Sequence, residues 1–365
     1  MAKNKALQDA AKARQDEFYT DRADIEREMK YYTEAFRGKV ILCNCDDPYE
    51  SEFFKYFSDL FNPLGLKRLI ATCYAGSPIA QQQLSLFDIE TPAPKRKPYC
   101  AVIEEVRDYN GDGAVDLRDV EWLLRNRRNT LRILNGDGDF RSPECIELLK
   151  EADIVVTNPP HSLLRDFIDL LMKYGKKFLV LGNINAVTYK DIFPYFMHNK
   201  IRLGVTIHSG DRKFYVPESY PLEAAGCGLD DDGRRFIRVK GVRWFTNLEH
   251  GRQNETIPLF RRYSTESEMF PHYDNYDAIE VSKVTDIPCD YDGVMGVPVT
   301  FLDKYNPKQF EILGITQRDS PMKTKIYTRD DDPKFGDLNA RATIRDKNGK
   351  LRSTYVRLLI RRKGE

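Results

Sequence analysis

The run Ile154-Val155-Val156-Thr157-Asn158-Pro159-Pro160-His161 is a short apolar stretch that ends in a polar loop containing two prolines. Its three consecutive β-branched residues predict a strand that is buried on both faces. The prolines restrict the backbone that follows, because each fixes φ near −65°. The sequence therefore predicts a rigid loop at the end of a buried strand.

The sequence on either side of this loop predicts an α/β fold. Segments with a helical pattern, such as 163–174, alternate with short apolar runs that predict strands. This alternation is typical of a parallel sheet covered by helices on both faces. The apolar runs are 39–43, 66–74, 100–106, 154–156, 177–181 and 201–205.

The pattern changes after about His250, where aromatic- and proline-rich segments with shorter strands begin. A chain of 365 residues is long enough for two domains. We therefore expect one domain at 1–250 and a smaller region at 251–365.

Composition excludes several classes of protein. Hydrophobic residues make up 41% of the chain, which is enough to bury a core. The N-terminus is polar and charged, unlike a secretion signal, and no apolar run approaches the roughly 20 residues of a membrane span. The seven cysteines are odd in number and contain no CxxC pair, which argues against a disulfide framework and a zinc site. We expect a cytoplasmic protein without a membrane partner.

Basic residues concentrate at the C-terminal end. The whole chain has 57 basic and 56 acidic residues, a net charge of +1, whereas 318–365 holds 14 Lys/Arg against 7 Asp/Glu, a difference of +7. The last run, 355–363, predicts a strand with a basic face or end. It is either an edge strand whose charges prevent aggregation or part of a surface for phosphates.

The Asn158–His161 loop suits the chemistry of an exocyclic amine on a base. Such an amine is a poor nucleophile, because its lone pair is delocalised into the ring. The side-chain oxygen of Asn158 and the carbonyl of Pro159 can accept its two hydrogens, while Pro160 helps to fix both acceptors. The His161 ring can stack on a base that has left the duplex. A tight Asn-Pro-Pro turn without function explains the same residues, so the loop alone does not decide.

The ordered motifs around the loop are more specific than the loop itself. They are Asp16-Glu17-Phe18-Tyr19-Thr20, Cys43-Asn44-Cys45-Asp46-Asp47-Pro48, Gly136-Asp137-Gly138-Asp139-Phe140-Arg141-Ser142, Arg243-Trp244-Phe245-Thr246-Asn247-Leu248 and Tyr291-Asp292-Gly293-Val294-Met295-Gly296-Val297-Pro298. Together with the loop they span nearly the whole chain and resemble the EcoRI-type adenine-specific methyltransferase family.

This resemblance implies a bacterial or phage-encoded enzyme that transfers a methyl group from S-adenosylmethionine to adenine N6 in double-stranded DNA. It implies a Rossmann-like methyltransferase sheet flanked by helices, with a smaller C-terminal target-recognition region. Asn158, Pro159, Pro160 and His161 would form the catalytic loop. The enzyme would act as a monomer, either beside a restriction enzyme or as an orphan methylase.

The resemblance also implies which residues bind the cofactor. Asp139 and Phe140 would end a sheet strand at the adenine of S-adenosylmethionine. Tyr19 and Thr20 would lie at its methionine end. The usual Gly-x-Gly loop is absent after the first strand, and Asp46 or Asp47 there would accept from the methionine amine or the ribose hydroxyls. Simple helix capping also explains these two aspartates.

His161 departs from the Phe or Tyr that is usual in the family. Imidazole stacks on a base with less area than a phenyl or phenol ring. We expect weaker stacking and a gain in activity from His161→Phe. Three alternatives remain open: a weakly active or non-catalytic DNA-binding protein on this scaffold, a cytosine-N4 methyltransferase, and an RNA methyltransferase.

Two further motifs suggest binding partners. Asp108, Asn110, Asp112 and Asp119 have the spacing of an EF-hand calcium loop, although a structural turn explains them equally well. The run Gln83-Leu84-Ser85-Leu86-Phe87 resembles the peptide by which bacterial proteins dock on the sliding clamp. A short amphipathic strand or helix is the alternative for this run.

Overall fold

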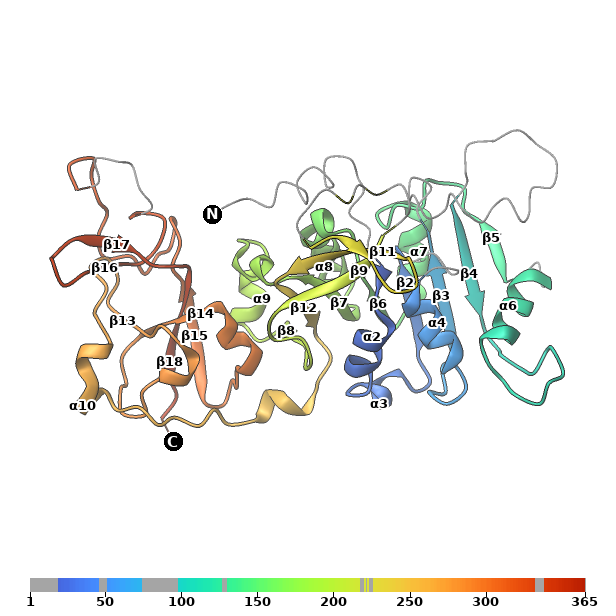
Figure 1. Cartoon of the computed structure of the whole chain (residues 1–365), viewed down its shortest axis with the longest axis horizontal. Helices are drawn as coiled ribbons and strands as arrows, with labels where there is room; N and C mark the ends of the chain where they lie inside the picture. Colours follow the sequence, from blue (N-terminus) through green and yellow to red (C-terminus); the bar gives the residue numbers. More distant parts are fainter. Residues whose placement is uncertain are drawn as a thin grey trace. The chain divides into compact units, whose positions relative to one another are not determined.

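The computed structural model describes residues 19–45, 51–73, 98–126, 130–216, 220, 222, 226–331 and 338–364. The chain divides into two compact units (Figure 1). The first consists of Met1–Ala186 and Gly204–Leu248, and the second of Val187–Leu203 and Glu249–Glu365. The second unit therefore takes one segment from the middle of the chain. Among the described residues, no helix is long and apolar enough to cross a membrane.

A large mixed sheet forms the centre of the first unit. Its strands are β2 (Val40–Asn44), β3 (Arg68–Thr72), β4 (Tyr99–Ile103), β5 (Leu131–Ile133), β6 (Ile154–Thr157), β7 (Lys177–Asn183) and β12 (Val242–Thr246). They lie in the order β5-β4-β3-β2-β6-β7-β12. The four strands β3, β2, β6 and β7 are parallel, as predicted.

The expectation of a wholly parallel sheet is wrong. β4 runs antiparallel to both β3 and β5, and β12 runs antiparallel to β7. Strand direction depends on the path of the connection, which the apolar runs do not report. The predicted strand at 201–205 shrinks to β8 (Arg202–Leu203), which belongs to the second unit.

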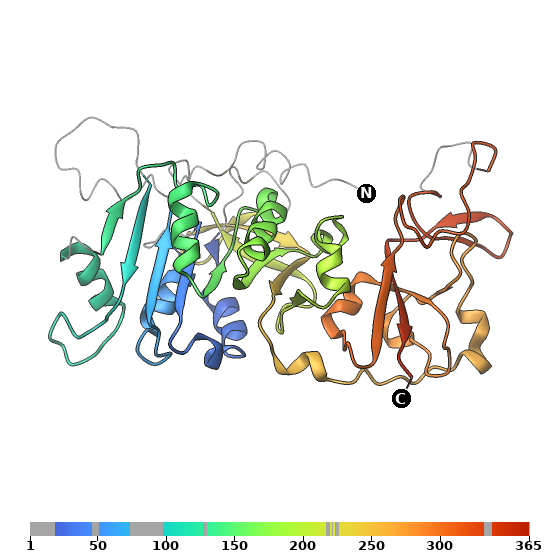
Figure 2. The ribbon, with the colours of Figure 1, turned by 180° about the vertical axis from the view of Figure 1, so that it is seen from behind.

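Helices cover both faces of the large sheet, which confirms the predicted α/β class. The helices α2 (Arg22–Met29), α3 (Thr33–Phe36), α4 (Glu52–Asp59) and α6 (Leu117–Asn126) share one apolar core with the sheet residues Ile41 and Val156. The helices α7 (Pro143–Glu151) and α8 (Leu164–Lys173) lie on the other face, toward the viewer in Figure 2. The amphipathic pattern of α8 buries Leu164, Phe167, Ile168 and Leu171.

A second, smaller sheet of the first unit was not predicted. Its strands are β1 (Tyr19–Thr20), β9 (Asp211–Tyr215), β11 (Arg235–Lys240) and β10 (Gly228–Leu229), in that order. All neighbouring pairs are antiparallel. The sheet therefore joins Tyr19–Thr20 to a segment about 195 residues later in the chain.

The second unit contains a four-stranded sheet and a separate hairpin. The sheet has the order β13-β14-β18-β15, and the hairpin pairs β16 with β17. The elements of this unit are β8, α9 (Phe193–Met197), α10 (Tyr263–Glu266), β13 (Ile279–Glu280), β14 (Met295–Pro298), β15 (Phe310–Ile315), β16 (Thr343–Arg345), β17 (Leu351–Ser353) and β18 (Arg357–Arg362).

The basic C-terminal run is not an edge strand. β18 lies between β14 and β15, and Leu358, Leu359 and Ile360 are fully buried. Arg357 is buried as well, and its guanidinium binds the carboxylate of Glu280 at 2.6 Å. The edge-strand alternative is therefore wrong, because a buried ion pair accommodates one of the charges that surround the three apolar residues of the run.

Candidate active site

The predicted loop lies where the order of the parallel strands reverses. From β2, the chain continues to β3 on one side and later returns to β6 on the other side. In open α/β sheets such a reversal leaves a crevice at the carboxyl ends of the strands, and ligands bind there. β2 ends at Asn44 and β6 at Thr157, and the hydroxyl of Thr157 donates to the carbonyl of Asn44. This bond fixes the start of the loop beside the end of β2.

The loop itself is buried and short. Asn158 is 5% exposed, and Pro159 and Pro160 are buried as well. A single 3-10 turn, His161–Leu163, follows and leads directly into α8. The amide of Leu163 donates to the carbonyl of Pro160 at 2.9 Å. The loop is thus held at one end by a buried strand and at the other by a helix.

His161 contacts a residue that the sequence did not single out. Its ring lies edge-to-face against Phe214 of β9, with ring centroids 6.1 Å apart and planes at 88°. Phe214 is 1% exposed. The small sheet therefore reaches the predicted catalytic loop. The three consecutive residues Phe214-Tyr215-Val216, which favour a strand, are a local signal for β9, but they do not indicate its contact with the loop.

The small sheet separates the two residues predicted at the methionine end of the cofactor. Thr20 pairs with Phe214, and Tyr19 pairs with Tyr215. Directly paired residues of antiparallel strands share a face, and successive residues point to opposite faces. Thr20 therefore lies on the face that meets His161, whereas Tyr19 lies on the other face.

Asp139 and Phe140 do not end a strand, which corrects the prediction. β5 ends at Ile133, and the two residues lie in the loop before α7. Gly138, with φ of 78°, turns the backbone out of an extended path there. The prediction is wrong about the local structure of these two residues. Their place in the chain is as predicted, since they precede the helix that leads into β6.

The Asp139–Phe140 loop is held by specific contacts. Arg141 binds the carboxylate of Asp139 through two nitrogens, at 2.9 and 2.7 Å. This hydrogen-bonded pairing raises the pKa of Arg141. Phe140 is buried and packs edge-to-face on Phe167 of α8, with centroids 5.0 Å apart. The backbone that presents Asp139 is therefore well defined.

Three buried polar atoms lie on strands of the large sheet and the small sheet. They are the hydroxyl oxygens of Thr20 and Thr72 and the side-chain oxygen of Asn44. None of these atoms has a hydrogen-bond partner within the part of the chain that the structure describes. Asn44 and Thr72 are directly paired at the ends of β2 and β3. Buried polar groups normally have partners, so these atoms fit a ligand that supplies hydroxyl or amine groups.

The turn after β2 is only partly described. Cys45 has φ of 63°, in the left-handed region that glycine usually occupies. The left-handed turn is thus present although the Gly-x-Gly sequence is not. Asp46 and Asp47 lie outside the described residues. Helix α4 begins at Glu52 with Ser51 as its N-cap, so neither aspartate is the capping residue of α4.

The predicted calcium loop gains no support. The carboxylate of Asp108 accepts from the amides of Gly111 and Gly113, and that of Asp119 accepts from Tyr109 and Asp116. Within the described ranges, no three His, Cys, Asp or Glu side chains gather to hold a metal ion. These contacts, together with the Asn110–Asp112 hydrogen bond, form a self-contained turn. The clamp-binding run at 83–87 lies outside the described residues and stays a prediction.

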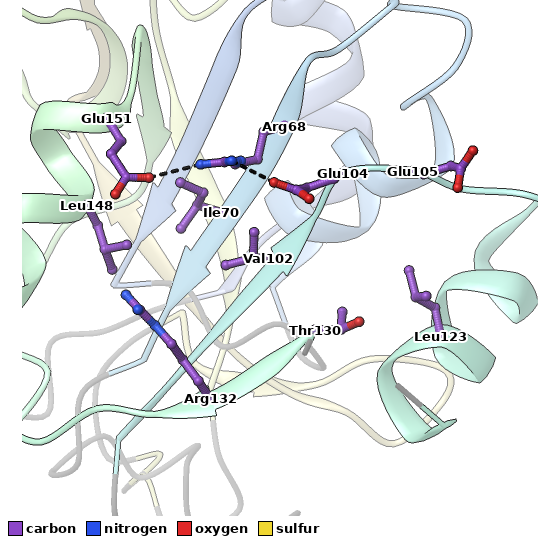
Figure 3. Close-up of a pocket in the computed structure, with 10 residues that line it drawn as sticks. All are labelled: Arg68, Ile70, Val102, Glu104, Glu105, Leu123, Thr130, Arg132, Leu148 and Glu151. Carbon is purple, nitrogen blue, oxygen red and sulfur yellow. Dashed lines mark hydrogen bonds and ion pairs between the residues drawn. The ribbon is translucent and has the colours of Figure 1, made fainter. Parts of the chain in front are cut away.

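A cavity of about 710 Å³ lies elsewhere in the first unit (Figure 3). Arg68 spans one side of it and binds both Glu104 and Glu151. Ile70 and Val102 form its floor, and Arg132 points into it from β5. None of the predicted site residues lines this cavity, so it lends no support to the predicted cofactor site.

Comparisons with known proteins agree with the motifs. Residues 6–363 match the model of the family described as adenine-specific methyltransferase EcoRI. The chain is 45% identical over 328 residues to the Type II methyltransferase M.EcoRI of Escherichia coli, which covers 89% of this chain and 94% of that protein. It is 37% identical over 365 residues to the Type II methyltransferase M.MpnI of Mycoplasma pneumoniae, with 97% of each chain covered. No solved structure matches the chain.

Proposed function

Since the chain belongs to the EcoRI family of adenine-specific methyltransferases, we propose that Asn158–His161 is the loop that holds the target adenine of DNA. The family assigns the activity, which is S-adenosylmethionine-dependent methylation of adenine in DNA. It also favours adenine over the cytosine-N4 alternative. The roles of individual residues are our proposal.

Asn158 and Pro159 would prepare the amine for attack. Their oxygens accept the two N6 hydrogens, which draws the nitrogen toward tetrahedral geometry and frees its lone pair. When bound, S-adenosylmethionine supplies an activated methyl group for that lone pair. Pro160 keeps the two acceptors fixed, so both oxygens are already in position when the base binds. His161 stacks on the base after it leaves the duplex.

The cofactor would lie at the carboxyl ends of β2 and β3. Asn44 and Thr72 provide buried polar atoms there, and Thr20 provides one from the small sheet. Asp139 and Phe140, from the loop before α7, would hold the adenine ring of the cofactor. Asp46 or Asp47 remains our proposal for the methionine amine or ribose.

This proposal revises one predicted contact. Tyr19 lies on the face of the small sheet opposite to Thr20 and Phe214. We therefore assign the cofactor contact to Thr20.

One observation carries the proposal. The hydroxyl of Thr157 is bonded to the carbonyl of Asn44, so the Asn158 loop starts beside the end of the strand that faces the predicted cofactor. A methyl donor and an amine acceptor must meet within a few ångströms, and this pairing of strand ends supports binding of both at one site.

Replacing Asn158 tests the assignment. Asn158→Ala removes one of the two acceptors, and we expect methyl transfer to fall by about 10²–10³-fold. The measurement is transfer of labelled methyl to DNA under single-turnover conditions. Binding of S-adenosylmethionine, followed by calorimetry, should persist because Asn158 does not hold the cofactor. Asn126→Ala, an exposed asparagine of α6, is the matched control and should keep full activity. Full activity of Asn158→Ala would contradict the proposal.

The two regions predicted from the sequence would have different roles. We propose that 1–250 carries cofactor and catalysis and that 251–365 recognises the target DNA. The excess of basic residues at 318–365 supports the second role, since Lys and Arg neutralise phosphates. Monomeric action remains a prediction, and the enzyme acts either beside a restriction enzyme or as an orphan methylase.

A further inference from the structure

We propose that the β16–β17 hairpin enters the major groove of the substrate DNA and that Asn348 at its tip reads a base edge. This inference rests on the proposed role of 251–365 in target recognition. Residues 341–353 contain five basic side chains and one acidic side chain. That density of positive charge exceeds the average of the C-terminal region and complements a duplex, which carries one phosphate per about 1.7 Å.

The shape of the hairpin suits a groove. β16 and β17 form a two-stranded sheet of their own, apart from the four-stranded sheet of the same unit. In Figures 1 and 2 the hairpin projects at the margin of that unit. A two-stranded ribbon fits the major groove of B-DNA, which is about 12 Å wide.

The base of the hairpin is firmly anchored. The side chain of Asn275 accepts from the amide of Thr343 at 2.8 Å and donates to the carbonyl of Arg341 at 2.9 Å. Ala342 is fully buried, and Ile344 packs against the same apolar cluster. An isolated ribbon is only marginally stable, so this anchoring is what lets the tip keep a fixed direction.

The tip is a preformed turn. The carboxylate of Asp346 accepts from the amides of Asn348 and Lys350, at 2.9 and 3.0 Å. These hydrogen bonds lower the pKa of Asp346, and the bond from the Lys350 amide has the largest effect. Gly349 has φ of 76°, which closes the turn. Because the turn satisfies its own backbone, the side chains at the tip remain available for a partner.

The charges that remain available lie at the tip. Arg345 is bound to Asp274, and Arg352 to Asp346. Lys347 and Lys350 are exposed, and neither forms an ion pair within the described part of the chain. Asn348 is exposed between them. One lysine thus lies on each side of the asparagine. The lysines can contact phosphates, and the asparagine side chain can form two hydrogen bonds with adenine in the major groove.

The test measures DNA affinity of the full-length protein carrying single substitutions. Lys347→Ala, Lys350→Ala and Asn348→Ala are compared with Lys283→Ala, an exposed lysine of the same unit outside the hairpin. Affinity is measured by fluorescence anisotropy between about 50 and 200 mM salt. One duplex contains the methylation site, identified by sequencing DNA that the wild type has modified, and the other has a scrambled sequence.

Each lysine variant should weaken binding to both duplexes equally. It should also reduce the magnitude of the slope of log binding constant against log salt concentration by about 0.9. Asn348→Ala should cost about tenfold or more on the specific duplex and leave the scrambled duplex unchanged. Variants that all match Lys283→Ala overturn the proposal, and lysine effects without an Asn348 effect overturn base reading. If the wild type methylates no DNA, the proposed function fails, whereas the salt slope on scrambled DNA still tests the hairpin.

Discussion

The contact between His161 and Phe214 links two parts of the chain at the level of single residues. The sequence indicates that His161 stands where the family usually has Phe or Tyr. The structure adds that the imidazole lies edge-to-face on a buried phenyl ring of β9. Phe214 therefore sets the plane of the ring that would stack on the base, and a substitution at 161 must keep this contact.

His161→Phe should raise the rate of methyl transfer. A phenyl ring keeps the edge-to-face contact with Phe214 and covers more of the base, and aromatic pairs contribute about 0.5–1.5 kcal/mol. We expect a gain of about two- to tenfold in the single-turnover rate. His198→Phe, at an exposed position, is the control and should leave the rate unchanged. A His161→Phe rate equal to or below that of the wild type would refute the stacking role.

The element that holds the small sheet in place is helix α2. Its residue Glu28 is fully buried and accepts from the amides of Val205 and Thr206, at 2.7 and 2.8 Å. The hydroxyls of Thr206 and Tyr32 donate to the same carboxylate. The segment that leads into β9, and so to Phe214, is therefore bound to the N-terminal helix through one side chain.

Glu28→Ala should destabilise the protein by about 2–4 kcal/mol. The substitution leaves the buried amide of Val205 and the partly buried amide of Thr206 without an acceptor, and loss of the acceptor of a buried amide costs about 1–3 kcal/mol. Urea unfolding followed by circular dichroism measures the change. Glu26→Ala removes an exposed partner of Arg22 on the same helix and should cost no more than about 0.5 kcal/mol. Equal effects of the two substitutions would show that Glu28 does not hold the segment.

At the scale of the whole molecule, the chain does not divide at one point. Val187–Leu203 belongs to the second unit although it lies between segments of the first. Within that unit, α9 packs against β15. Phe196 and Ile201 are 2% and 1% exposed, and Phe193 is buried as well. The second unit therefore combines this segment with Glu249–Glu365.

A fragment that ends at Leu248 should be poorly soluble. It keeps α9 but lacks β15, so Phe193 and Phe196 lose their packing and become exposed. Binding of a hydrophobic dye and light scattering, compared with the full chain, measure the effect. A fragment that also carries Phe193→Ser and Phe196→Ser should aggregate less. A soluble, monomeric 1–248 fragment with no more dye binding than the full chain would contradict the expectation.

The family, the activity and the position of the loop in the chain follow from the amino-acid sequence alone. Ile154–Thr157 is a buried strand followed by two prolines, and such local patterns depend on residues that are neighbours in sequence. The ordered motifs reinforced this local signal over nearly the whole chain, which is why they identified the family.

Which residues meet at the predicted site depends on contacts between distant parts of the chain. Phe214 reaches His161, and Thr20 rather than Tyr19 shares its face, because β1 pairs with a strand about 195 residues away. Antiparallel β4 and the central position of β18 likewise depend on distant pairing. Pairing between distant strands is set by the packing of the whole core, and no local pattern of apolar residues records it.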